Sequence, residues 1–129
     1  MSVVNARGLR QVALHAADLD RAIAFYRDVL GLRFVTRYDP PGLAFFDLDG
    51  VRLLFEAGAP PSLLYLRVDD IDAAATALAD AGVPLVGEPH VIFRDDDGRF
   101  DAPGTEIWQV GLKDSEDNLV VLEEGRVTR

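Results

Sequence analysis

The 129-residue sequence contains no cysteine and comparatively few basic residues. Without cysteine, neither a disulfide framework nor thiolate catalysis is available. Twenty-two acidic and 13 basic side chains give a formal net charge of −9, which repels the phosphates of nucleic acids and anionic lipids. The chain also lacks an apolar run of membrane-spanning length and an N-terminal signal pattern. We therefore expect a cytoplasmic protein without nucleic-acid or membrane partners.

Common catalytic motifs are missing as well. The sequence has neither a phosphate-cradling glycine motif nor a nucleophile elbow, and its serines fall in segments expected to be arm, linker or turn. What remains is an ordinary globular composition, with 49% apolar and 27% charged residues. A chain of this length can bury a core of its own, so we expect one domain spanning residues 1–129.

The most informative stretch is Asp18-Leu-Asp-Arg-Ala-Ile-Ala-Phe-Tyr-Arg-Asp-Val-Leu-Gly-Leu-Arg-Phe-Val35. Asp18 or Asp20 can cap a helix by accepting free backbone N–H groups. Apolar residues then recur at helical spacing, with Phe25 and Tyr26 expected in the core, and Gly31 stands where a helix ends in a left-handed conformation. A strand over residues 32–38 is expected to follow.

Two segments of the first half recur in the second half. Asp18-Leu-Asp matches Asp70-Ile-Asp72 at an offset of 52 residues, and the segment 47–54 matches 114–121 at an offset of 67. Two echoes in the same order indicate two copies of one supersecondary unit, each of which needs the other to cover its apolar face.

The remaining pattern predicts an α+β fold of two βαβββ modules, residues 9–56 and 63–124, joined by a linker at 57–62. Apolar alternation, turn residues and a second helix at 70–81 support this division. The arm 1–8 and the tail 125–129 are expected to be loose, and a strand at 83–86 to resume at 90–93. Residues 94–105 read as a surface loop whose Asp95-Asp-Asp97 fits a solvated turn better than a calcium loop.

The helix motif, together with Val68-Asp-Asp-Ile-Asp72, resembles the glyoxalase/bleomycin-resistance/dioxygenase family, the vicinal oxygen chelate superfamily. Asp114-Ser-Glu-Asp-Asn118 is similar to that family's acidic turn with two substitutions, and Glu88-Pro-His-Val-Ile92 followed by Trp108 is similar to its glyoxalase-like branch. The resemblance covers roughly residues 9–124. It implies paired βαβββ modules whose sheets curl into a cup for a small molecule and often a divalent metal, in a homodimer.

The resemblance also implies four metal-ligand positions, which here are Gln11, Leu54, Leu63 and Val121. Only glutamine among these can donate an electron pair, so no metal is expected at the usual site. A displaced site remains an alternative. Strand alternation puts Glu56 on the face of Leu54 and Glu123 on the face of Val121, where they could join Gln11 or His15 as ligands or share a proton as an acid/base pair. Solvated strand-end glutamates are the simpler interpretation.

Five side chains are candidates for ligand binding: Gln11, His15, Tyr65, His90 and Trp108. A neutral His90 could act as a general base, but a hydrogen-bonded structural histidine is the favoured interpretation. Tyr65 and Trp108 could stack on a planar ligand or fill the core. We therefore expect a small-molecule binder of the bleomycin-resistance kind, or an enzyme of unknown substrate, without the usual metal. The alternatives are a metal-dependent glyoxalase-like lyase, isomerase or dioxygenase using Glu56 and Glu123, and a purely structural module.

Overall fold

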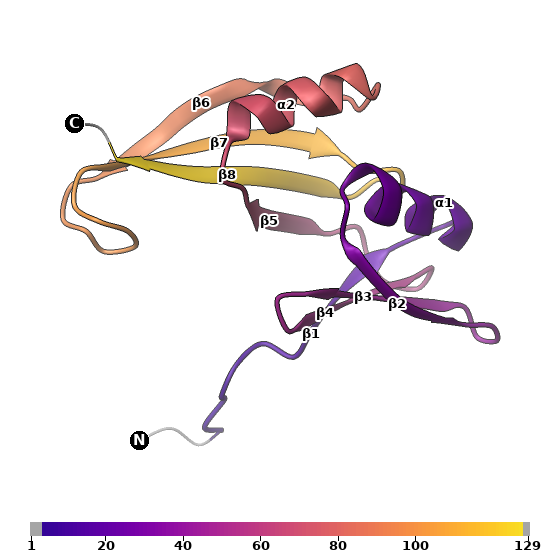
Figure 1. The fold of residues 1–129 in the computed structure, drawn as a ribbon. Coiled ribbons are helices and arrows are strands. Elements are labelled where there is room, and N and C mark those ends of the chain that lie inside the picture. Colours follow the sequence, from indigo (N-terminus) through magenta and orange to yellow (C-terminus); the bar gives the residue numbers. More distant parts are fainter. Residues whose placement is uncertain (1–3, 128–129) are drawn as a thin grey trace. The chain divides into compact units, whose positions relative to one another are not determined.

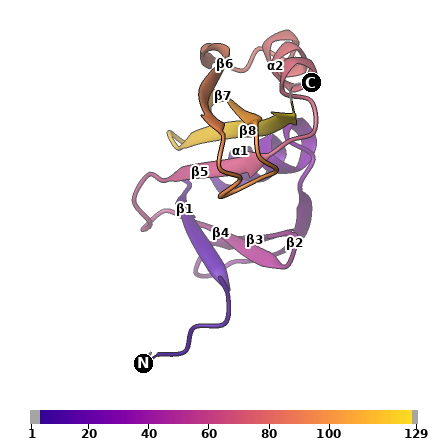
Figure 2. The same cartoon turned by 90° about the vertical axis from the view of Figure 1, so that its left-hand side faces the viewer.

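The computed structural model describes residues 4–127 and divides the chain into two compact units between Pro60 and Pro61. Each unit contains one four-stranded sheet and one helical segment (Figure 1). We call them the N-terminal unit and the C-terminal unit. Residues 4–10 contain no helix or strand and lead away from the first sheet in both views (Figures 1 and 2), in agreement with the predicted arm.

The N-terminal unit follows the order strand, helix and three strands. Its elements are β1 (Gln11–His15), α1 (Leu19–Ala24), the π-helical turn η1 (Phe25–Val29), β2 (Arg33–Tyr38), β3 (Leu43–Leu48) and β4 (Val51–Glu56). The sheet order is β1-β4-β3-β2, with β1 parallel to β4 and the other neighbours antiparallel.

The C-terminal unit repeats this order. Its elements are β5 (Leu63–Arg67), α2 (Ile71–Asp80), β6 (Leu85–Asp95), β7 (Thr105–Lys113) and β8 (Leu119–Val127). The sheet order is β5-β8-β7-β6, again with one parallel pair. The predicted α+β class with two βαβββ modules is therefore confirmed, and the fold is of the vicinal oxygen chelate type.

Both helices begin with the aspartate that the sequence repeat predicts. The Asp18 carboxylate accepts a hydrogen bond from the backbone N–H of Arg21 at 3.1 Å, and the Asp70 carboxylate accepts one from Ala73 at 3.0 Å. Gly31 follows the first helical segment with φ +75°. The first helix differs from expectation in its last turn, which widens into η1 and ends with the N–H of Leu30 bonded to the carbonyl of Phe25.

Each sheet buries one face against its own helix. In the N-terminal unit the rings of Tyr26, Phe46 and Phe55 pack together, with the Tyr26 and Phe55 centroids 4.5 Å apart. In the C-terminal unit the corresponding core is aliphatic and includes Leu112 and Leu122, and α2 packs over β6, β7 and β8 (Figure 1). Because strand side chains alternate, each sheet has an opposite face that carries no helix of its own unit. We call this the open face.

Two predicted boundaries were wrong in the C-terminal unit. Strand β8 continues through Val127, so residues 125–127 of the predicted loose tail are paired with β7, and residues 128–129 lie outside the described part. Strand β6 runs without a break from Leu85 to Asp95, because Gly87 with φ +76° lets the pairing shift register between Val86 and His90.

The acidic run at residues 95–97 is not a solvated turn throughout. Asp95 is only 4% exposed, and its carboxylate accepts hydrogen bonds from the backbone N–H groups of Asp101, Phe100 and Arg99 at 2.8–2.9 Å. These bonds, that of Asp101 most strongly, hold the pKa of Asp95 below its ordinary value. The other two aspartates pair with neighbouring arginines, so Asp95 organises the loop between β6 and β7 by itself.

Candidate binding site on the open faces

The parallel pairing of β1 with β4 determines which side chains share the open face of the N-terminal unit. Its register places three pairs side by side: Gln11 with Arg52, Ala13 with Leu54, and His15 with Glu56. The predicted candidates Gln11 and His15 thus lie on one face, at opposite ends of the same strand. The His15 ring Nδ1 is 3.0 Å from the backbone carbonyl oxygen of Ala59, which anchors the ring in the segment after β4.

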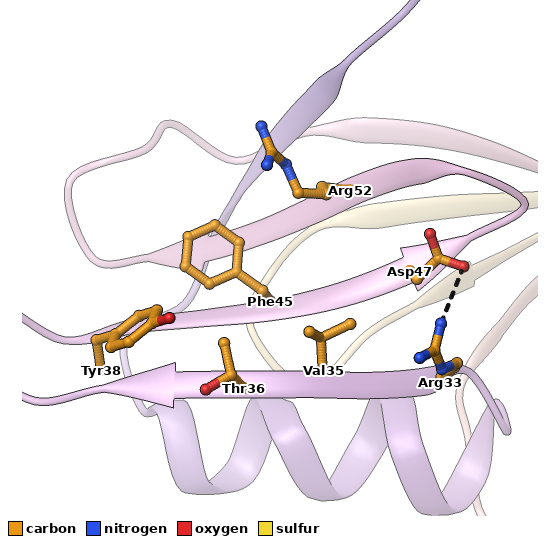
Figure 3. Close-up of a pocket in the computed structure, with 7 residues that line it drawn as sticks. All are labelled: Arg33, Val35, Thr36, Tyr38, Phe45, Asp47 and Arg52. Atoms are coloured by element: carbon orange, nitrogen blue, oxygen red, sulfur yellow. Dashed lines mark ion pairs between the residues drawn. The ribbon is translucent and has the colours of Figure 1, made fainter.

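A row of polar residues crosses this face from strand to strand. Gln11 is opposite Arg52, Arg52 is opposite Asp47 on β3, and Asp47 is opposite Arg33 on β2. The Arg33 guanidinium approaches the Asp47 carboxylate at 3.7 Å (Figure 3). We call Gln11, Arg52, Asp47 and Arg33 the polar row.

Next to the polar row the open face is hollowed. A depression of about 420 Å³ is lined by Arg33, Val35, Thr36, Tyr38, Phe45, Asp47 and Arg52. Phe45 and Tyr38 meet edge to face with centroids 6.0 Å apart, and a register shift between Phe34 and Thr36 helps to bring Thr36 onto this face. In Figure 3 these side chains point to the side of the strands away from the helix. The hollow therefore combines an apolar floor with charged groups at one end.

The sequence did not predict the hollow. None of its seven lining residues was a predicted candidate, because each alone reads as an ordinary strand residue or a solvated charge. The alternation of β3 and β4 contained a usable signal. It places Phe45 and Asp47 on the face of Arg52 and Leu54, once the hairpin at Asp49-Gly50 sets the pairing.

The C-terminal unit carries a different polar row on its open face. Arg67 is opposite Glu123, Glu123 is opposite Gln109, and Gln109 is opposite His90. The Gln109 side-chain amide donates a hydrogen bond to the Glu123 carboxylate at 2.8 Å. The sequence predicts His90 and Glu123 as site residues but carries no signal for Gln109, which lies between them. The His90 Nδ1 is 2.8 Å from the carbonyl oxygen of Glu88 in its own strand.

Apolar side chains continue this second face. Leu63 is 53% exposed and Tyr65 is 56% exposed, and Tyr65 is opposite Val121 in the parallel register. The predicted candidate Tyr65 therefore lies on the open face rather than in the core. Its ring can contact a ligand or a partner surface.

Trp108 lies on the other side of the same sheet. It is opposite Glu124, whose carboxylate accepts a hydrogen bond from the backbone N–H of Ile71 at the start of α2. The Arg126 guanidinium stacks 4.3 Å from the centre of the indole ring, and the indole N–H donates to Glu106 at 3.3 Å. Of the two roles that the sequence left open for Trp108, lining the cup or filling the core, strand alternation favours a place on the helix side of the sheet.

The four positions that the family resemblance implies for a metal carry the wrong chemistry here. Gln11 and Leu54 share the open face of the first sheet, and Leu63 and Val121 share that of the second. Three of the four side chains are hydrocarbons without a lone pair, whereas a tight divalent site typically needs about three protein ligands. These residues do not fit a metal ion.

The two glutamates of the predicted displaced metal site belong to different units of the chain. Glu56 neighbours His15 in the N-terminal unit, and Glu123 is engaged by Gln109 in the C-terminal unit. Within residues 4–127, no three His, Asp or Glu side chains form a group suited to a metal ion.

Comparison with known proteins identifies the family. Residues 8–108 match the model of the Glyoxalase/Bleomycin resistance protein/Dioxygenase superfamily, so the chain belongs to this superfamily. A search of curated proteins found no significant match. None of the helices in the described residues is long and apolar enough to cross a lipid bilayer.

Solved structures of similar fold have different names. Lactoylglutathione lyase from Agrobacterium tumefaciens is 25% identical, with a TM-score of 0.71 over 93% of this chain and 95% of that protein. TnmS3, an antibiotic-binding protein from Streptomyces sp. CB03234, is 17% identical with a TM-score of 0.75, covering 95% and 98%. A glyoxalase/bleomycin resistance protein/dioxygenase from Alicyclobacillus acidocaldarius is 22% identical with a TM-score of 0.65, covering 95% and 94%.

Proposed function

We propose that this protein binds a small organic molecule in the hollow on the open face of its N-terminal unit. The observation that carries the proposal is the hollow itself, which joins the rings of Phe45 and Tyr38 to the charged end formed by Arg33, Asp47 and Arg52. A planar ligand gains apolar contact with the rings and orientation from the charges. The similarity to an antibiotic-binding protein supports a binding role on this fold.

Binding is proposed to proceed without a metal at the family's usual positions, because Leu54, Leu63 and Val121 cannot coordinate one. The similarity to a lactoylglutathione lyase is the reason to retain the metal-dependent alternative. That alternative requires Glu56 and Glu123 to act as ligands with Gln11 or His15.

Nuclear magnetic resonance can test where ligands bind. We expect planar aromatic fragments to perturb backbone amides of β2, β3 and β4, and Phe45→Ala to weaken binding about tenfold through lost apolar contact. Phe93→Ala is the matched control, because Phe93 is a partly exposed strand phenylalanine of the C-terminal unit. Perturbations confined to β5–β8, or equal binding by Phe45→Ala, would contradict the proposed site.

Elemental analysis separates the two functions. The protein is purified without chelator and analysed again after dialysis against Zn²⁺, Ni²⁺, Mn²⁺ or Fe²⁺. The binding proposal expects far less than one metal ion per chain. Stoichiometric metal that is lost in both Glu56→Gln and Glu123→Gln would instead support the lyase, isomerase or dioxygenase function.

The remaining partner predictions belong to this proposal as well. We propose a cytoplasmic homodimer, on the basis of the family resemblance and the acidic, cysteine-free composition. Light scattering of the purified protein measures the oligomeric state directly, and a monomer at micromolar concentration would contradict the dimer.

A further inference from the structure

The charged end of the hollow is positive, although the chain as a whole is strongly negative. Two arginines, Arg33 and Arg52, lie on the strands that flank one acidic residue, Asp47, in a chain of net charge −9. Their formal sum is one positive charge. A local charge opposite to that of the whole molecule focuses oppositely charged ligands toward the place where it lies.

The two guanidiniums retain donors for a ligand. Arg33 approaches Asp47 only at 3.7 Å, beyond hydrogen-bond distance, and its side chain is 75% exposed. Within residues 4–127, the Arg52 side chain makes neither an ion pair nor a side-chain hydrogen bond. By contrast, Arg37 of the same unit contacts both Asp20 and Asp39, so few of its N–H groups remain for a ligand. Arg33 and Arg52 are therefore the two cations that face the hollow with unused N–H groups.

Backbone pairing of β3, which carries Asp47, with β2 and β4 holds this arrangement in register. Asp47 is paired across the sheet with both arginines, through β3–β4 on one side and β2–β3 on the other. Their Cα positions are thus set by backbone pairing rather than by flexible loops, which lowers the entropy cost of presenting both charges to one ligand. Gln11 extends the row beyond Arg52 with a neutral amide.

We propose that the hollow selects ligands that carry a single carboxylate on a planar apolar body. The carboxylate is bound by Arg52 and Arg33 at the charged end, and the apolar body lies against Phe45 and Tyr38. This inference rests on the proposed function and names its ligand class. Arginine suits a carboxylate because its planar fork can donate two parallel hydrogen bonds.

The count of charges favours a monoanion over a dianion. One carboxylate neutralises the excess positive charge of the row, whereas a phosphate dianion would leave an excess negative charge next to Asp47. The Asp47 carboxylate therefore acts as a filter on ligand charge. Its removal is expected to strengthen binding of anions and to reduce the preference for singly charged ones.

The test compares two probes of the same shape and different charge, 2-naphthoate and 2-naphthamide, by calorimetry and amide-shift mapping. We expect 2-naphthoate to bind the native protein about tenfold more tightly than the amide, and Arg52→Gln to abolish that preference. Arg33→Gln is expected to reduce the preference in the same direction. Arg27→Gln is the matched control, since it removes the same charge from the helical segment of the same unit.

A second pair of measurements tests whether Asp47 selects ligands by their charge. Asp47→Asn is expected to tighten 2-naphthoate binding about threefold and to tighten binding of 2-naphthyl phosphate by a larger factor. Weaker anion binding by Asp47→Asn would overturn the role of this carboxylate, because removing a negative charge can weaken an anion site only if that group positions the arginines.

The same experiments distinguish failure of the ligand-class inference from failure of the proposed binding site. If 2-naphthoate and 2-naphthamide bind equally in the hollow and Arg52→Gln changes neither, the ligand-class inference is overturned while the proposed site stands. If both probes perturb only the C-terminal unit, or neither perturbs any amide at millimolar concentration, the proposed site is itself overturned. A preference for naphthoate that survives Arg52→Gln and Arg33→Gln but disappears in Arg27→Gln would place the anion site elsewhere.

Discussion

The two units share a topology but carry different residues on their open faces. Both have a strand, a capped helix and three further strands in the same pairing order. Both bury the helix-side face, one with aromatic rings and the other with aliphatic side chains. The need to bury apolar side chains therefore constrains the helix-side face of each sheet. The residues of the open face can differ between the two units.

Matching the registers shows how far this specialisation goes. The positions of Gln11, Arg52 and Asp47 in the first sheet correspond to Leu63, Leu119 and Lys113 in the second. The row that is polar in the N-terminal unit is thus largely apolar in the C-terminal unit. The negative charge of Asp47 is replaced there by the positive charge of Lys113. The N-terminal unit combines aromatic and charged residues around its hollow, whereas the C-terminal unit concentrates its polar groups around Glu123 and Gln109.

We expect the largest loss of stability from truncating buried core side chains. Phe55 is fully buried against Tyr26 and Phe46, so Phe55→Ala should lower the free energy of unfolding by about 3–5 kcal/mol. Its counterpart Leu122→Ala should cost about 2–5 kcal/mol for the same reason. Urea denaturation followed by circular dichroism measures both.

The same experiment tests whether the units form one domain. Trp108 is the only tryptophan and lies in the C-terminal unit, so its fluorescence reports on that unit alone. One domain predicts that Phe55→Ala shifts the fluorescence transition together with the dichroism transition. An unshifted fluorescence transition would show that the units unfold independently.

A smaller effect is expected at the acidic turns. The sequence repeat aligns Asp47 with Asp114, but the registers match Asp47 with Lys113, because the second turn contains more residues than the first. Asp114 is buried and accepts hydrogen bonds from the N–H groups of Glu116 and Asn118 and from the Asn118 side chain, each at 2.8 Å. Asp114→Ala should cost about 3 kcal/mol because buried donors lose their acceptor.

Asp47→Ala supplies the contrasting measurement. Its carboxylate faces the hollow and makes only a long contact with Arg33, so its removal should change the free energy of unfolding by about 0.5 kcal/mol or less. Thermal or urea unfolding of both variants compares the two aspartates directly. Equal costs would mean that Asp47 is structural and would weaken its assignment to the hollow.

The smallest expected effect is local and depends on pH. The β6–β7 loop of the C-terminal unit is held by ionised Asp95, whereas the N-terminal unit spans the equivalent connection with the short turn 39–42. Because the pKa of Asp95 is lowered in the folded state, its stabilisation is fully present above the ordinary value of 3.8 and is lost as the pH falls through the lower folded value.

Amide shifts of Arg99, Phe100 and Asp101 recorded between about pH 5 and pH 2 follow this loss. They should titrate together, with a midpoint below 3.8, while the fold persists. In Asp95→Asn this joint titration should be absent. Persistence of the same titration in that variant would assign it to another carboxylate.

The sequence predicted the fold well because the relevant signals are local. Asp18 and Asp70 identified both helix starts, and the repeat of apolar alternation identified the paired modules. It failed where a side chain's role depends on a distant strand. Arg33, Asp47 and Arg52 lie up to 19 positions apart, and only the pairing of β2, β3 and β4 makes them neighbours. The sequence also left open which face Trp108 occupies, because the face of β7 depends on its register with β8.

The sequence by itself therefore determined the superfamily, the two βαβββ modules, the helix caps and the lack of metal-ligating side chains at three of the family's four positions. These follow from residue chemistry and short-range periodicity. Only the tertiary structure decided which face each strand side chain occupies, that Asp95 and Asp114 are buried acceptors, and that two arginines lie on the strands flanking Asp47 beside a hollow. Strand pairing brings together residues whose relation has no local signature in the chain.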